Sequence, residues 1–137
     1  MDLIEETFLA VAPELVSAAI REPEFTAALW PDLDLGVFMD RGPDGVRWAA
    51  TGALVGSVEV WLEPFADGVM AHTFVRADLT RRGSRTEAIA DLDWRKAVAE
   101  HQRRARRAKA VWWSVKDRLE ADRAPGEPAV AAAASER

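Results

Sequence analysis

The sequence predicts an α+β fold in which a curved antiparallel sheet wraps around one long C-terminal helix. The first indication is the stretch from Thr86 to Asp122, which contains neither glycine nor proline. Along it, eight side chains recur at steps of three and four residues, the spacing that places them on one face of a helix. They are Trp94, Val98, His101, Ala105, Ala108, Trp112, Val115 and Leu119. The second indication is that the preceding chain reads as short strands joined by glycine turns, from which we expect five to seven strands.

The N-terminal third predicts one strand followed by two short helices. Residues 2–12 alternate in the manner of a strand. Pro13 and Glu14 then begin a helix, because proline suits the first helical position and an acid suits the positive end of the helix. Pro23 ends that helix and opens a second one, which Pro31 stops. Two helices are therefore expected between the first and second strands.

The middle of the chain predicts further strands at residues 32–41, 46–52, 57–63 and 69–78. The first two of these are joined by a turn at residues 42–45 with two glycines, and the last two by an Asp67-Gly68 hairpin signal. With that hairpin centred on Ala66 and Asp67, four cross-strand pairs share one face. They are Ser57 with Arg76, Glu59 with Phe74, Trp61 with His72, and Glu63 with Met70.

The ends of the long helix are also marked in the sequence. Ser84 and Glu87 have the spacing of a capping box, so we expect the helix to begin beside them. Pro125, Gly126 and Pro128 end it, and we expect a domain at residues 1–123 with a disordered, Ala- and Pro-rich tail at 124–137. The basic side chains are expected on the exposed face of the helix, among them Arg103, Arg104, Arg106 and Lys109.

Composition narrows the chemistry that the chain can perform. A chain of 137 residues forms one domain, and without cysteine it has no disulfide and no thiolate nucleophile. His72 and His101 are the only histidines, and neither stands in a metal-binding pattern, so we expect no metal and no cofactor. We also expect no integral membrane segment and no signal peptide, and therefore a cytoplasmic protein, as a monomer or homodimer.

Charge is distributed unevenly along the chain. Residues 1–75 contain 13 acidic and 3 basic side chains, whereas residues 76–137 contain 10 acidic and 15 basic ones. One interpretation is a solvated helix face that complements an acidic sheet. The other is a surface for an anionic partner, centred on residues 103–109. Because the net charge is −5 and acids are interspersed, we expect no tight binding to nucleic acid.

The order of elements and the positions of the turns resemble the START-like (SRPBCC) helix-grip superfamily. The resemblance is carried by PELVSAAI after the first strand, then WPDL, DRGPDGVRW, GSVEVWLEP and DGVMAHTF. It covers residues 1–120 and is greatest to the bacterial polyketide cyclase/dehydrase and lipid-transport branch. It implies a cavity between the sheet and the C-terminal helix that holds a small hydrophobic ligand. The sequence departs from the family in having fewer strands before the final helix.

The candidate site depends on which face of the sheet lines that cavity. Either Val58, Val60 and Leu62 point inward, or Glu59, Trp61 and His72 do. The second arrangement would offer His72 with Glu59 for proton transfer. His101 is the other candidate acid or base, because its helix face is expected to look at the sheet. The full set of expected ligand-binding residues is Trp48, Trp61, His72, Trp94, His101, Ala105, Ala108 and Trp112.

Three functions remain open on the sequence alone. The first is non-enzymatic binding or transport of a small hydrophobic or aromatic molecule, lipid-like or polyketide-like. The second is a cyclase or dehydrase that uses His72 or His101 with Glu59 and no metal. The third is an interaction module in which the basic helix contacts a protein or an anionic surface.

Overall fold

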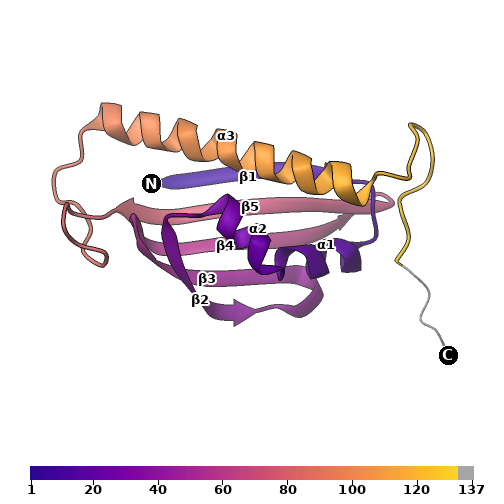
Figure 1. Ribbon diagram of the computed structural model, residues 1–137, viewed down its shortest axis with the longest axis horizontal. Helices are drawn as coiled ribbons and strands as arrows, with labels where there is room; N and C mark the ends of the chain where they lie inside the picture. Colours follow the sequence, from indigo (N-terminus) through magenta and orange to yellow (C-terminus); the bar gives the residue numbers. More distant parts are fainter. Residues whose placement is uncertain (133–137) are drawn as a thin grey trace.

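In the computed structural model, which describes residues 1–132, five antiparallel strands form one open sheet in the order β1-β5-β4-β3-β2. The strands are β1 (Asp2–Leu9), β2 (Leu33–Asp40), β3 (Gly45–Gly52), β4 (Leu54–Phe65) and β5 (Gly68–Leu79). In the same described residues, three α-helices accompany them: α1 (Pro13–Ile20), α2 (Pro23–Leu29) and α3 (Trp94–Leu119). A short 3-10 turn, η1 (Gly42–Asp44), joins β2 to β3. Figure 1 shows α3 running along β1, with α1 and α2 lying in front of the other strands.

The expected fold class and strand count are confirmed, and so is the register of the β4–β5 hairpin. Trp61 pairs with His72 and Glu59 pairs with Phe74, as the alternation predicts. The turn between the strands places Ala66 at a φ of 51°, and Gly68 follows it without a side chain. A Cβ on Gly68 would lie 2.3 Å from the carbonyl oxygen of Leu9, so glycine allows β1 to lie close at this point.

The face of the sheet beneath the helices is apolar and the opposite face is mixed. Val58, Val60 and Leu62 are buried on the helix side, together with Thr73 and Val75 of β5. Around them the helices contribute Val16, Ile20, Phe25, Leu29 and Trp112 to a single core cluster. The first of the two arrangements left open by the sequence is therefore correct, and Glu59, Trp61 and His72 lie on the outer face.

The long helix begins at Trp94 and not at Thr86. Ser84 does accept hydrogen bonds from the backbone amides of Thr86 and Glu87, but no helix follows. Instead, the amide of Arg81 bonds the carbonyl of Glu87, which folds this segment back on itself. The helix is capped by Asp93, whose side chain accepts the amide of Arg95. The expected capping box thus forms a loop, and the true cap lies further along the chain.

Two lysines attach α3 to the outer edge of β1. Lys109 donates to the carbonyl of Glu6 at 3.1 Å, and Lys116 donates to that of Phe8 at 2.8 Å. Beyond the strand, the amide of Val130 donates to the carbonyl of Ala10. These bonds occupy edge groups of β1 that would otherwise be free to pair with another strand. Val130 belongs to the tail expected at residues 124–137, so this part of the tail is bonded to the domain. Residues 133–137 lie outside the described residues.

Candidate functional site

The space between the sheet and the C-terminal half of α3 is filled by the protein's own side chains. Trp112 is 0% exposed, and its indole nitrogen donates to the hydroxyl of Thr73 at 2.7 Å. Its ring packs edge-to-face against Phe25, with centroids 5.1 Å apart. Beneath it, Val60 and Thr73 are fully buried. Ala108 is also buried on α3, so its small size allows close approach of helix and sheet.

In the N-terminal half of α3, the buried side chain is that of Arg104 and not that of His101. Arg104 is 5% exposed and binds Asp32 at 2.6 Å and Glu100 at 2.5 Å. His101 and Val98 are exposed, and Ala105 is only half-buried. The expectation that His101 is buried and Arg104 exposed is therefore wrong. The other three basic residues expected on the surface are exposed: Arg103, Arg106 and Lys109.

Arg104 belongs to a small network of charges between α3 and the loop after α2. Glu100 accepts from both Arg103 and Arg104. Burial tends to raise the pKa of Glu100, but the hydrogen bonds from the two guanidinium groups outweigh it, so that the pKa lies below its ordinary value. The charges of this network are therefore matched within the domain.

A second buried carboxylate lies on β1. Glu5 is 6% exposed and binds Lys109 of α3 at 2.5 Å. The same carboxylate oxygen accepts the hydroxyl of Thr7 at 2.7 Å. Glu5 and Thr7 thus provide polar contacts along the line where α3 crosses the edge of the sheet.

The outer face of the sheet holds a stacked ladder of rings. His72 lies on Trp61 with centroids 4.5 Å apart and is followed by Phe74 at 6.3 Å. Both ring nitrogens of His72 meet carboxylates, Glu6 at 2.7 Å and Glu63 at 3.1 Å. These contacts fix the ring on the surface of the sheet that faces away from the helices.

The three candidate acid–base residues do not meet around one pocket. Glu59 shares the outer face with His72 but pairs with Arg41 and Arg47. His101 lies on α3, on the other side of the sheet. Within residues 1–132, no group of three or more histidine, aspartate or glutamate side chains is arranged to hold a metal ion.

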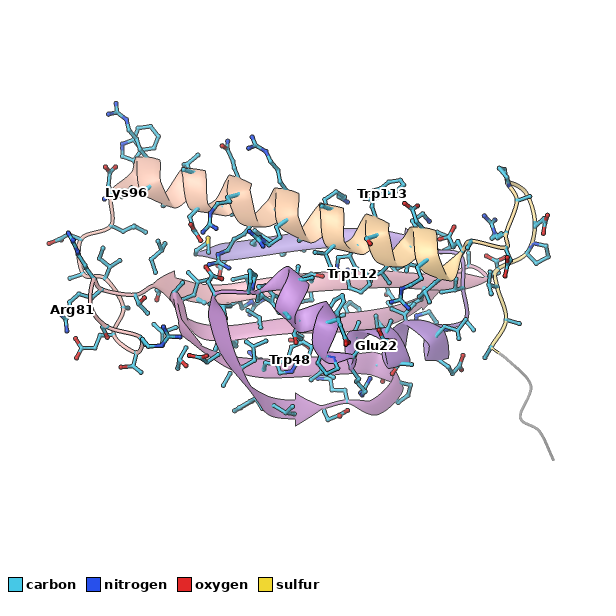
Figure 2. All side chains as sticks on the ribbon, viewed as in Figure 1. Glu22, Trp48, Arg81, Lys96, Trp112 and Trp113 are labelled. Carbon is cyan, nitrogen blue, oxygen red and sulfur yellow. The ribbon has the colours of Figure 1, made fainter. Side chains whose placement is uncertain are left out.

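The expected aromatic walls are also separated from one another. Trp48 is buried and packs edge-to-face with Trp30 at 5.6 Å, in the core beneath α2. Trp94 is 68% exposed at the first turn of α3. Figure 2 shows Trp112 on the side of α3 that faces the sheet and Trp113 on the opposite side. The expected ligand-binding residues therefore fall into separate groups, with Ala108 and Trp112 under α3 and Trp61 and His72 on the outer face.

Three solved structures superpose on most of the chain. They are the Aha1 dimer from Colwellia psychrerythraea (TM-score 0.58, 11% identity, 90% of this chain and 99% of that one), DR_A0006 from Deinococcus radiodurans (0.61, 10%, 89% and 99%) and TTHA0849 from Thermus thermophilus (0.54, 13%, 90% and 100%). This chain has the START-like helix-grip fold. No family model and no curated protein matches the sequence. At these identities the likeness concerns the fold alone.

With its interior filled, this helix-grip domain offers grooves at its surface. One of them, the α2–α3 groove, has a volume of about 370 Å³ and is lined from two helices. Phe25 and Ala28 line it from α2, and Val111 and Val115 line it from α3. Its walls are completed by Glu22, Glu24, Ala110, Ser114 and Arg118. Arg118 and Glu22 approach to 3.6 Å across the groove.

Two further grooves flank the helix-grip core. One, of about 430 Å³, lies between α2 and β2 and is lined by Thr26, Ala27, Trp30, Pro31, Leu33 and Leu35. The other, of about 370 Å³, lies beside the start of α3 and is lined by Met1, Asp2, Leu92, Ala97, Val98, His101 and Gln102. His101 therefore lines a surface groove, away from Trp112 and the filled interior.

The residues of the α2–α3 groove were not among those expected to bind a ligand. Their signal in the sequence is weak. Val115 reads as a core position, Val111 lies beside the predicted buried face of the long helix, and Ala28 is one small residue in a short helix. The contact between α2 and α3 is a tertiary feature of two segments far apart in the chain. No local pattern around Phe25 or Val111 encodes it.

Proposed function

We propose that this protein binds a small apolar molecule in the α2–α3 groove. The observation that carries the proposal is the composition of the groove: an apolar floor of Phe25, Val111 and Val115, with Ser114 and Arg118 beside it. Ligand sites commonly combine an apolar lining with a few polar groups that orient the ligand. The volume of about 370 Å³ is in the range of sites for small molecules.

The position of the groove favours binding without disruption of the core. Phe25 is 5% exposed and lies between the groove and Trp112. A ligand resting on Phe25 would bury apolar surface at roughly 25 cal/mol per Å² and leave the bond from Trp112 to Thr73 intact. The charged rim combines Arg118, which faces Glu22 at 3.6 Å, with Glu24, so the polar end of a ligand can bond to a cation or to a carboxylate, and the proposal rests on the apolar character of the ligand.

The first experiment measures binding of the fluorescent probe ANS and its displacement by fatty acids and aromatic acids. Ala28→Phe places a ring in the groove and should weaken binding about tenfold or more, because the ligand and the new ring compete for one volume. Its melting temperature should remain close to that of the wild type, since Ala28 is exposed in the free protein. Native mass spectrometry of the purified protein would identify a co-purified ligand.

Two matched variants decide where the ligand lies. Ala18→Phe adds the same ring to the exposed side of α1 and should leave binding unchanged. Ala27→Phe adds it to the groove between α2 and β2. If Ala27→Phe abolishes binding and Ala28→Phe does not, the α2–α3 groove is the wrong site. If none of the ligands displaces ANS and none co-purifies, the proposed function is wrong.

A further inference from the structure

The outer face of α3 carries cations that have no partner inside the described part of the molecule. Five basic residues of the helix pair with carboxylates of the domain: Arg103, Arg104, Lys109, Lys116 and Arg118. Within residues 1–132, four others form no ion pair: Arg95, Lys96, Arg106 and Arg107. The protein as a whole has a net charge of −5. These four cations, gathered on one helix, form a local positive surface that an anionic partner can recognise.

Apolar side chains lie exposed at the same end of the helix. Leu92, Trp94 and Val98 are 38%, 68% and 45% exposed. The guanidinium of Arg95 lies 5.4 Å from the centre of the Trp94 ring. Leu92 and Val98 also line the groove beside the start of α3. The surface therefore combines free cations with exposed apolar groups, one of them a tryptophan.

The shape of the molecule makes this surface accessible to a flat partner. The 26 residues of α3 span roughly 39 Å. In Figure 1 the helix forms one long side of the molecule, and in Figure 2 Lys96 and Trp113 lie along that side. Trp113 is half exposed near the other end of the helix.

We propose that α3 docks this protein on the surface of an anionic phospholipid membrane. Basic residues near such a surface attract its lipids, and tryptophan favours the interface between headgroups and acyl chains. Exposed leucine, valine and tryptophan contribute little to contact with the phosphate backbone of a nucleic acid, whereas they can enter the apolar part of a membrane interface. None of the helices in residues 1–132 combines the length and apolar character of a membrane span, so the contact is peripheral.

The experiment measures co-sedimentation of the full chain with phosphatidylcholine vesicles that contain or lack phosphatidylglycerol. Binding should require phosphatidylglycerol and weaken at high salt. Arg106→Gln and Arg107→Gln should each weaken it about fivefold, and the double variant about 25-fold. Trp94→Ser should weaken it as well, because the ring no longer enters the interface.

Matched variants away from α3 serve as controls. Arg76→Gln removes an exposed arginine of β5, and Phe38→Ser removes an aromatic ring of β2 that is 64% exposed. Both should bind vesicles as the wild type does, and so should Ala28→Phe, which tests the groove separately. Equal binding to both kinds of vesicle, no binding to either, or equal losses in Arg106→Gln and Arg76→Gln would overturn the proposal. Tighter binding to an acidic protein or to RNA than to the vesicles would also overturn it.

Discussion

Arg103 and Arg104 are adjacent on α3 and both bind Glu100, but their surroundings differ. The side chain of Arg103 is 52% exposed, whereas that of Arg104 is 4% exposed and also binds Asp32. One oxygen of Asp32 is buried and has no hydrogen-bond partner among the described residues. Asp32 therefore depends on Arg104 for the compensation of its charge.

This difference predicts unequal losses of stability for the two arginines. Arg104→Ala should lower the free energy of unfolding by about 3–5 kcal/mol, because it leaves carboxylates in a partly buried site without their cation. Arg103→Ala should lower it by less than about 1 kcal/mol, as is usual for an exposed pair. Urea denaturation of both variants measures the difference. Similar losses would show that Arg104 is accessible to water in solution.

Trp112 and Trp113 provide a second pair of adjacent residues with opposite environments. Trp112→Ala should cost about 3–5 kcal/mol, because it removes a fully buried ring and leaves the Thr73 hydroxyl without its donor. Trp113→Ala should cost much less, since half of that side chain is exposed. Equal denaturation midpoints for the two variants would contradict the orientation of α3.

At the scale of the element, the acid sensitivity of α3 follows from two glutamates. Burial opposes the charged form of Glu120, but bonds from Lys116 and from the amide of Ala10 outweigh it and lower the pKa. The pKa of Glu100 is lowered in the same way, because bonds from Arg103 and Arg104 outweigh the effect of burial. A carboxyl whose pKa is lower in the folded state binds its proton more readily in the unfolded chain. The stabilisation is therefore complete above the ordinary pKa of 4.5 and is lost as the pH falls through the folded value.

We accordingly expect the free energy of unfolding to fall with pH below 4.5. Glu100→Gln should be less stable than the wild type at neutral pH and should lose less stability on acidification, because the shifted group is gone. Asp117→Asn removes an exposed carboxyl from the same helix and should keep the wild-type profile. Urea midpoints at neutral and acidic pH compare the three proteins. Parallel profiles for Glu100→Gln and wild type would contradict the argument.

The burial pattern of α3 shows where sequence periodicity predicts the buried face and where it fails. In the C-terminal half, the spacing of Ala108, Trp112 and Val115 identified the buried face, because the sheet and α2 lie beneath it. In the N-terminal half, the same spacing selected Val98 and His101, which are exposed. There the inward position is taken by an arginine that pairs with the loop after α2, and periodicity contains no information about such neighbours.

Alternation was more informative for the sheet than periodicity was for the helix. The hairpin register follows from turn position and side-chain alternation, both of which are local, and all four predicted pairs form. Which face meets the helices was left open, because each face carries apolar groups. The stacking of Trp61 on His72 explains how aromatic rings are accommodated on the outer face.

At the scale of the whole molecule, the space between the sheet and the C-terminal half of α3 is filled by the protein's own side chains. Trp112 occupies the position between sheet and helix where a container would hold its ligand, and Phe25 covers it from α2. Binding is therefore expected at the surface of this core, in the α2–α3 groove, and not within it. The same conclusion assigns opposite roles to two alanines of α3, Ala108 in the packed interface and Ala99 on the exposed side.

Ala108→Leu is the most direct test of a filled interior. If the space under α3 is packed, the added carbons have nowhere to go, and the variant should lose about 1–3 kcal/mol of stability through displaced neighbours. Ala99→Leu makes the same chemical change on the solvent side and should alter stability by less than about 0.5 kcal/mol. Thermal and urea denaturation of both variants measure these effects. An Ala108→Leu protein as stable as Ala99→Leu would reveal unfilled volume beneath the helix, and the ligand would then be sought between Trp112 and the sheet.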